Sequence, residues 1–223
     1  MADLIASETR ERAACSGGSS DNAIYSMVRR SIASRNIQGA LAIDLGCGHG
    51  ALKPILDLFF RDYIGVDAVR YDHFPAEASF VGADLNAVPF PLNSRLADAT
   101  FAIETIEHLE NPRALVREMV RLTKPGGWIV VSTPNQLSFL SLGALLIKRR
   151  FSAFQDVHWP AHITALLESD LLRIASELQL RDAAIEYSQS GRIVLTPFHY
   201  PSFLARLCPR LCSDNLLLIA RTP

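Results

Sequence analysis

Three glycines at alternate positions follow a short apolar segment early in the chain. They belong to the stretch Asp44-Leu-Gly-Cys-Gly-His-Gly50, which comes directly after the apolar residues 40–43. Glycines between a buried strand and a helix permit a tight turn and let a ligand approach the backbone closely. The relaxed dinucleotide-binding pattern has similar glycines, but Asp44 would repel a pyrophosphate at this turn and would attract a cation. The stretch therefore favours a ligand that carries positive charge.

Two more aspartates follow the next two predicted strands. Asp67 ends the strand predicted for residues 63–66, and Asp84 comes just after the strand predicted for residues 79–82. Asp67 can accept hydrogen bonds from both hydroxyls of a ribose, while Asp84 can accept one from an adenine amino group and Leu85 can pack on the ring. Each aspartate alone is also a common turn residue or helix cap. Together with the glycine stretch they favour S-adenosylmethionine, which has an ammonium group, a sulfonium and no phosphate.

A cluster of two acids and one histidine follows the fourth predicted strand, residues 99–103. Glu104, Glu107 and His108 share one face if a helix begins at Glu104. Two carboxylates and one imidazole suit a divalent metal ion such as Mg²⁺ or Mn²⁺. The alternative is that Glu104 contacts the cofactor or caps the helix, while His108 is a surface group. Both interpretations stay open from the residues alone.

Bringing these side chains to one place requires strands that alternate with helices. The strands predicted are, in chain order, residues 40–44, 63–66, 79–82, 99–103, 128–132, 183–187 and 216–220. Apolar residues at helical spacing predict helices that begin at Asp21 or Asn22, near Leu52, at Pro112 and near Leu167. This alternation indicates a parallel sheet covered on both faces. We expect one doubly wound α/β domain over residues 21–223, preceded by a flexible segment 1–20.

Five stretches in this order resemble the motifs of class I S-adenosylmethionine-dependent methyltransferases. They are Asp44-Leu-Gly-Cys-Gly-His-Gly50, Tyr63-Ile-Gly-Val-Asp67, Ala83-Asp-Leu85, Glu104-Thr-Ile-Glu-His-Leu109 and Leu122-Thr-Lys-Pro-Gly-Gly-Trp128. The resemblance implies a Rossmann-like, mostly parallel seven-stranded sheet whose last strand is antiparallel. The residues that it implies for cofactor binding are Asp44, Gly46, Cys47, Gly48, Gly50, Asp67, Ala68, Asp84, Leu85 and Glu104.

The fourth of these stretches also suggests a branch of the family. Glu104-Thr-Ile-Glu-His108 is similar to the stretch found in ubiquinone-pathway O-methyltransferases and in small-RNA 3′-terminal methyltransferases, where a metal is used. The comparison implies that a metal or His108 lowers the pKa of an acceptor hydroxyl. The chain has nothing that resembles the Asn/Asp-Pro-Pro-Tyr motif used to methylate the exocyclic amines of bases.

Two further histidines, His158 and His162, flank Trp159-Pro160 in the segment that overhangs the acceptor pocket in this family. Each is a candidate general base or second metal ligand, and the alternative is plain hydrogen bonding within the loop. We predict O-methylation of a small-molecule acceptor or of one linked to a lipid or sugar. The alternatives are a nicotinamide-dependent oxidoreductase and a non-catalytic module that binds S-adenosylmethionine.

Two apolar segments belong neither to the predicted strands nor to the motifs that resemble the methyltransferase family. Residues 191–213 form a connection longer than a hairpin needs, and residues 137–147 are apolar all round and precede Lys148-Arg-Arg150. Each segment fits the core; together they also fit a lip for a lipid-linked acceptor or a peripheral membrane anchor. We expect residues 191–213 to be a substrate-side insertion.

Composition and charge indicate which classes of partner the protein binds and in which cellular compartment it lies. Lys and Arg number 22 against 23 Asp and Glu, so the basic excess of a general nucleic-acid binder is missing and no nucleic-acid partner is expected. The N-terminus lacks the apolar stretch of a signal peptide, the longest apolar-rich run is shorter than the ~20 residues of a membrane span, and the four cysteines show no paired spacing. We expect a cytoplasmic protein, with peripheral membrane contact as the open alternative; the oligomeric state is not determined.

Overall fold

A computed structural model of the chain describes residues 17–223, so most of the expected flexible segment 1–20 lies outside the described residues. In the described part, seven strands form one sheet: β1 (Gly39–Leu45), β2 (Phe60–Asp67), β3 (Ser79–Gly82), β4 (Ala97–Ala102), β5 (Thr123–Pro134), β6 (Arg181–Tyr187) and β7 (Asn215–Arg221). The helices are α2 (Asn22–Ser34), α3 (Lys53–Leu56), α4 (Pro112–Leu122), α5 (Phe139–Lys148), α6 (Glu168–Glu177) and α7 (Ser202–Leu207). Three short 3₁₀ turns are η1 (Ile106–His108), η2 (Ser152–Phe154) and η3 (Asp156–His158).

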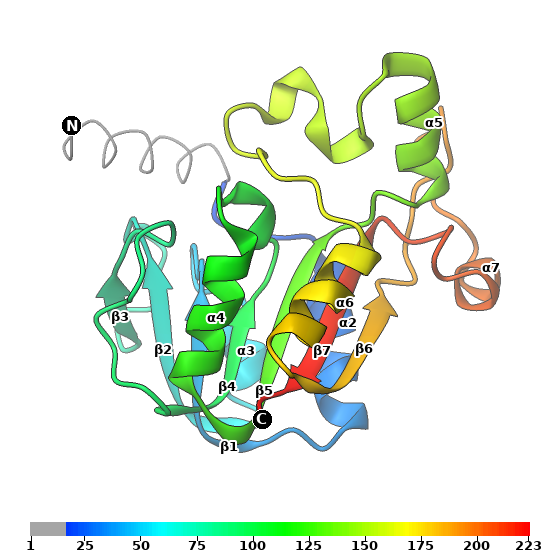
Figure 1. The fold of residues 1–223 in the computed structure, drawn as a ribbon. Helices are drawn as coiled ribbons and strands as arrows, with labels where there is room; N and C mark the ends of the chain where they lie inside the picture. The colour runs from blue at the N-terminus through cyan, green and yellow to red at the C-terminus, as the bar shows by residue number, and fades with distance from the viewer. Residues whose placement is uncertain (1–16) are drawn as a thin grey trace.

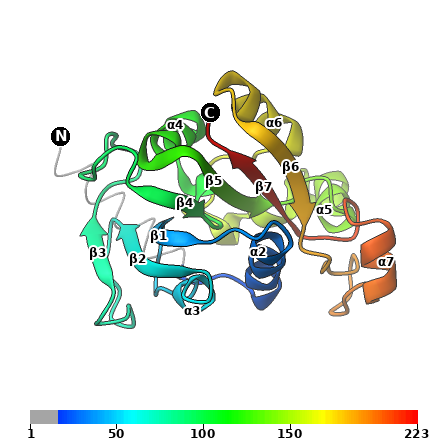
Figure 2. The same cartoon turned by 90° about the horizontal axis from the view of Figure 1, so that it is seen from below.

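The sheet has the order β3-β2-β1-β4-β5-β7-β6 (Figure 1). All neighbouring strands are parallel except β7, which runs antiparallel to both β5 and β6. Helices α2 and α3 cover one face and α4 and α6 cover the other, as the view from below shows (Figure 2). The predicted doubly wound sheet with an antiparallel last strand is therefore confirmed.

Helix α4 shows how local sequence sets an element that the site depends on. Asn111 caps it, because the Asn111 side chain accepts a hydrogen bond from the Ala114 N–H, and Pro112 occupies the first turn. Leu115 and Met119 lie on its buried face, where they join the core beneath β4 and β5. The predicted start of this helix is confirmed.

The helix predicted near Leu52 is shorter than its apolar spacing suggests. Helix α3 ends at Leu56, and Phe60 already begins β2. The reason is the sheet: Phe60 is the register partner of Gly39 at the start of β1, so pairing with β1 takes precedence over helix extension. None of the helices in residues 17–223 is long and apolar enough to cross a bilayer.

Candidate active site

A cavity of about 290 Å³ opens at the carboxyl ends of β1, β2 and β4. Its walls include every residue predicted to contact the cofactor except Gly50: Asp44, Gly46, Cys47, Gly48, Asp67, Ala68, Asp84, Leu85 and Glu104. Gly50 instead faces Pro75, whose Cδ would lie 2.6 Å from an added Cβ. The structure therefore brings the predicted binding residues to one place, as the carboxyl edge of an open α/β sheet requires.

The glycine turn joins β1 to two other parts of the cavity wall. Gly48 has a φ of 49°, and its N–H donates a hydrogen bond of 2.9 Å to Oδ2 of Asp67. A Cβ at position 48 would lie only 2.1 Å from the carbonyl oxygen of Gly18. The same Gly18 oxygen accepts a hydrogen bond of 2.9 Å from the N–H of His49. Only glycine fits at position 48, and residues 18–20, which were expected to belong to the flexible segment, line the cavity.

Asp44 is a buried carboxyl at the base of the cavity. The Tyr63 hydroxyl donates a hydrogen bond of 2.8 Å to Oδ2 of Asp44. Burial raises the pKa of Asp44 to about 7, and the nearby Asp67 adds to the rise. A cationic group beside Asp44 would reverse part of that rise, because an opposite charge favours the ionised form.

Glu104 does not form the helical face with Glu107 and His108 that the spacing suggests. Glu104 has a φ of 50°, and the 3₁₀ turn η1 begins only at Ile106. The Ser132 hydroxyl and the Asn215 amide donate hydrogen bonds of 2.7 Å to its two carboxylate oxygens. Both carboxylate oxygens of Glu104 already accept a hydrogen bond, so the structure does not group Glu104 with Glu107 and His108, and the predicted metal set of Glu104, Glu107 and His108 stays a prediction.

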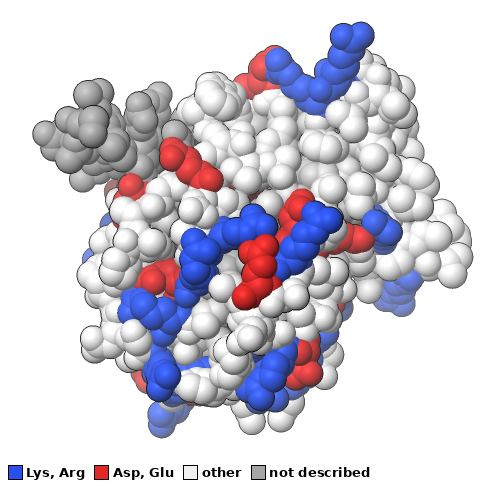
Figure 3. Space-filling model, in the orientation of Figure 1, with Lys and Arg blue, Asp and Glu red and all other residues white. Residues whose placement is uncertain are grey.

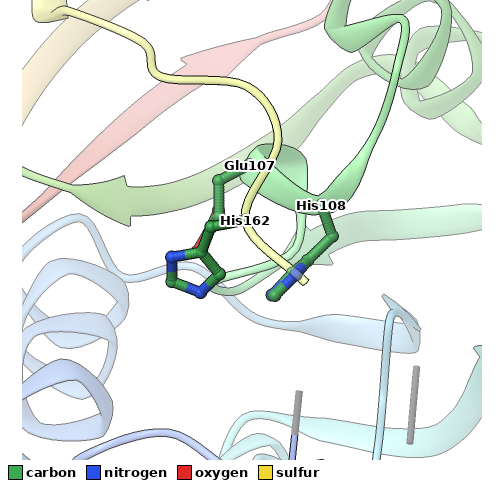
Figure 4. A group of neighbouring side chains, drawn as sticks. All are labelled: Glu107, His108 and His162. Carbon is green, nitrogen blue, oxygen red and sulfur yellow. The ribbon is translucent and has the colours of Figure 1, made fainter. Parts of the chain in front are cut away.

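The structure instead brings Glu107 and His108 together with His162. One donor atom of each residue lies within 4.8 Å of the others (Figure 4). Glu107 is fully buried, and its carboxyl oxygens form no close hydrogen bond among the described residues, although the buried Thr133 hydroxyl lies near enough to act on its pKa in the lowering direction. Burial raises the pKa of Glu107 to about 8. A buried carboxyl group without a close hydrogen bond is costly whether it is neutral or ionised, so Glu107 is a candidate contact for a ligand or ion at this point.

Both histidines of this cluster are oriented by backbone carbonyls. Nδ1 of His108 lies 2.8 Å from the Ala161 oxygen, and Nδ1 of His162 lies 2.7 Å from the Ala153 oxygen. Hydrogen bonds from Nδ1–H to carbonyls are the usual support of metal-binding imidazoles, and the Glu104 backbone is a second partner that raises the pKa of His108. Burial lowers the pKa of both rings, to about 4 for His162, so both are neutral near pH 7.

The loop that carries His162 is tied to η1. The N–H groups of Ile163 and Thr164 each donate a hydrogen bond of 3.0 Å to the Glu107 carbonyl oxygen. These bonds bring a residue 54 positions away in sequence against His108, with ring centroids 4.8 Å apart. A carboxylate and two neutral imidazoles form a donor set that fits a borderline divalent ion.

His158 lies behind this cluster. It does not line the cavity of the described chain, its Nδ1 accepts a hydrogen bond of 3.3 Å from the Gln155 N–H, and its ring stacks on His162 at 5.4 Å. These contacts support the loop-bonding interpretation of His158. Its predicted catalytic role stays a prediction.

One wall residue and one residue behind the wall, Tyr25 and Asn215, were not foreseen from the sequence. Tyr25 of α2 lines the cavity, and its hydroxyl accepts a hydrogen bond of 3.0 Å from the Ser20 N–H. Asn215 holds Glu104 although it stands at the far end of the chain. For Tyr25, the only local signal was its position within the predicted amphipathic helix. Asn215 had no local signal, because it reaches the site through the pairing of β7 with β5.

Residues 24–184 match the protein family described as "Methyltransferase domain". Among curated relatives, a ubiquinone biosynthesis O-methyltransferase of Bordetella avium is 30% identical over 126 residues, which cover 51% of this chain and 52% of the relative. A mitochondrial ubiquinone biosynthesis O-methyltransferase of Dictyostelium discoideum is 33% identical, over 57% of this chain and 46% of the relative. The chain thus spans about half the length of these relatives.

A solved structure shares the fold over nearly the whole chain. The crystal structure of a SAM dependent methyltransferase from Archaeoglobus fulgidus has a TM-score of 0.63 at 20% identity. The likeness covers 89% of this chain and 94% of that one.

Proposed function

This chain belongs to the family of class I S-adenosylmethionine-dependent methyltransferases, and on that premise we propose that it methylates a hydroxyl oxygen of a small-molecule acceptor. Family membership sets aside the nicotinamide-dependent oxidoreductase. The observation that carries the proposal is the cluster of Glu107, His108 and His162 in the wall of the cavity that Asp44, Asp67 and Asp84 also line. Groups able to activate a hydroxyl thus lie beside groups able to hold the methyl donor.

Four of the wall residues would bind S-adenosylmethionine directly. Asp67 accepts hydrogen bonds from the ribose hydroxyls, Asp84 accepts one from the adenine amino group, and Leu85 packs on the ring. Asp44 attracts the ammonium group of the methionine end. Binding at the carboxyl edge then directs the sulfonium methyl group toward η1.

Methyl transfer is an in-line displacement. The acceptor oxygen forms a bond to the methyl carbon while the carbon–sulfur bond breaks, and S-adenosylhomocysteine leaves with the electron pair. A sulfonium is a good leaving group, so the protein contributes mainly positioning and removal of the hydroxyl proton. The neutral imidazole of His108, oriented by the Ala161 carbonyl, can take that proton.

The residues present fit a divalent metal. Glu107, His108 and His162 would hold it, since no close hydrogen bond within the described part of the chain engages the Glu107 carboxyl and both rings are oriented. When bound, such an ion lowers the pKa of the acceptor hydroxyl. We favour Mn²⁺ over Mg²⁺, because two imidazoles suit a borderline ion better than a hard one.

Removal of the metal should distinguish the two ways of activating the hydroxyl. We expect EDTA to abolish turnover and added Mn²⁺ to restore it, measured as release of S-adenosylhomocysteine. S-Adenosylhomocysteine binding itself should be indifferent to EDTA. Turnover that ignores EDTA, together with an impaired His108→Ala variant, would instead assign His108 as a direct base; an unimpaired His108→Ala variant would remove both roles.

Affinity for S-adenosylhomocysteine should rise with pH up to about pH 7. The pKa of Asp44 is raised to about 7 in the free protein, and the ligand's ammonium group favours the ionised form. Below this pKa binding must release the Asp44 proton, so each unit of decreasing pH weakens binding by up to about tenfold. Calorimetry across this range measures the slope.

The matched variant for this measurement is Asp44→Asn, which keeps an acceptor for the Tyr63 hydroxyl. It should bind more weakly and with a flatter pH dependence. Asp67, whose pKa is also raised by burial, would account for a residual slope. A slope that is the same in both proteins would contradict the role of Asp44.

The acceptor itself can be found by mass spectrometry. The names of the relatives support a hydroxyl acceptor, and the chain would be incubated with S-adenosylmethionine and fractionated small-molecule, lipid and glycoconjugate extracts. A species that gains the mass of one methylene identifies the acceptor. S-Adenosylhomocysteine binding without any methylated product would favour a non-catalytic module instead.

A further inference from the structure

Helix α5 is apolar along almost its whole length, yet it is poorly buried. Its sequence is FLSLGALLIK, and Ser141 is the one buried residue of this fully described helix. Leu146 is 84% exposed and Ile147 is 63% exposed. Apolar side chains left in water forgo the stabilisation that burial brings, so a helix of this composition normally has a cover. The described chain does not supply one for this end of α5.

The connection between β6 and β7, residues 191–213, lies against α5. A Cβ added to Gly143 would be 3.1 Å from Cγ1 of Val194, and the rings of Phe139 and Tyr200 have centroids 6.2 Å apart. Figures 1 and 2 both place α5 and α7 on the same side of the molecule. We call the exposed apolar residues of these two segments the α5–α7 surface: Phe139, Leu145, Leu146, Ile147, Leu195, Phe198, Phe203, Leu204 and Leu207.

Cations surround the α5–α7 surface. Lys148 and Arg149 follow its apolar residues at the end of α5, and Arg206 lies within α7; all three are exposed, and none forms an ion pair within residues 17–223. The arginines nearby that do pair are Arg150 with Asp156, Arg192 with Asp214 and Arg210 with Glu168. Figure 3 shows this side as largely uncharged, with Lys and Arg at its upper and lower edges. The surface therefore combines exposed apolar groups with unpaired positive charge.

The structure favours one of the three interpretations that the sequence left open for these segments. High exposure excludes core packing for the residues of the α5–α7 surface. The walls described for the cavity contain no residue of 137–150 or 191–213, so neither segment borders that cavity; the role of 191–213 as a substrate-side insertion stays a prediction. A second copy of the chain is disfavoured as a cover, because a two-fold contact would bring the unpaired cations of both copies together.

We propose that the α5–α7 surface docks on an anionic phospholipid bilayer. The leucine, isoleucine and phenylalanine side chains would enter the boundary between headgroups and acyl chains, while Lys148, Arg149 and Arg206 contact phosphates. Residues 149–167 lead from α5 to the loop that presents His162 at the cavity. A bilayer bound at α5 would therefore lie next to the segment that borders the site. The docking surface does not depend on the reaction proposed above.

Vesicle sedimentation tests the proposal without a methyl donor or acceptor. We expect the chain to bind vesicles of phosphatidylcholine and phosphatidylglycerol in equal amounts, and to bind phosphatidylcholine vesicles much more weakly. The triple variant Leu146→Ser, Ile147→Ser and Phe203→Ser should lose about tenfold or more in partitioning, since all three side chains are exposed and contribute buried apolar area only on the bilayer. Lys148→Gln with Arg206→Gln should weaken binding and reduce its sensitivity to salt.

Leu58→Ser is the matched control, because Leu58 is 62% exposed and follows α3 on another side of the molecule. It should partition like the unaltered chain, and circular dichroism should confirm that every variant is folded. Equal and weak binding of the unaltered chain to both vesicles would overturn the proposal. So would a triple variant that binds vesicles normally but changes its oligomeric state, since the surface would then join copies of this chain.

Discussion

Gly48→Ala should weaken binding of S-adenosylhomocysteine by about 100-fold or more, which is about 2.7 kcal/mol. The added Cβ would lie 2.1 Å from the Gly18 carbonyl oxygen, at a backbone φ of 49° that side chains rarely adopt. To remove this clash, the glycine turn would have to move away from residues 17–20. Because the Gly48 N–H also binds Asp67, that movement would displace the proposed ribose acceptor as well. Calorimetry measures the affinity.

Gly126→Ala is the control for this variant. Gly126 has a φ of 75°, but the nearest atom to an added Cβ is Nη2 of Arg221 at 3.7 Å. Both variants therefore carry the left-handed backbone penalty of about 1–2 kcal/mol, and only Gly48→Ala adds a clash at the cavity. Gly126→Ala should lower the thermal midpoint and leave affinity unchanged. Equal loss of affinity in the two variants would contradict the assignment of the glycine turn as the binding site.

Glu107→Gln should lower turnover by about 10²–10⁴-fold while leaving S-adenosylhomocysteine affinity nearly unchanged. The amide has nearly the shape of the carboxyl, but it cannot take a negative charge or supply a carboxylate ligand. Glu107 is fully buried and its carboxyl oxygens form no close hydrogen bond in the described part of the chain. We therefore expect its carboxyl group to act with His108 and His162.

The free energy of unfolding of the Glu107→Gln variant distinguishes a role in turnover from a role in holding the fold together. The pKa of Glu107 is raised to about 8, so near pH 7 the free protein buries a mostly neutral carboxyl group that lacks a close hydrogen bond; an amide of the same shape should not lower the free energy of unfolding. Glu77→Gln makes the same chemical change at an exposed site and should alter neither turnover nor stability. If Glu107→Gln retains full turnover, or if it unfolds the chain, the proposed role of Glu107 is wrong.

Most of the fold followed from patterns that are local in sequence. The strand predicted for residues 79–82 has those bounds in the structure, and the cap and proline at Asn111-Pro112 begin α4. Alternating strands and helices leave few topologies, because crossovers between parallel strands are right-handed and both faces must be covered. The carboxyl edge of that sheet then gathers Asp44, Asp67 and Asp84.

The composition of the metal-type cluster did not follow from local patterns. The spacing of Glu104, Glu107 and His108 predicted that all three side chains share one helix face and could bind one metal ion. That prediction required a helix that begins at Glu104. The left-handed φ at Glu104 turns that side chain toward Ser132 and Asn215. His162 takes its place, because the loop that carries it is hydrogen-bonded to the Glu107 carbonyl.

The sequence by itself thus determined the sheet, the glycine turn and the three aspartates at the strand ends, since each depends on residues adjacent in the chain. Only the tertiary structure decided the partners of Glu107, the engagement of Glu104 and the exposure of α5. These features depend on segments far apart in sequence: β7 beside β5, the 149–167 loop over η1, and residues 191–213 against α5. Such contacts form only when the whole chain packs, and no periodicity or spacing within one segment records them.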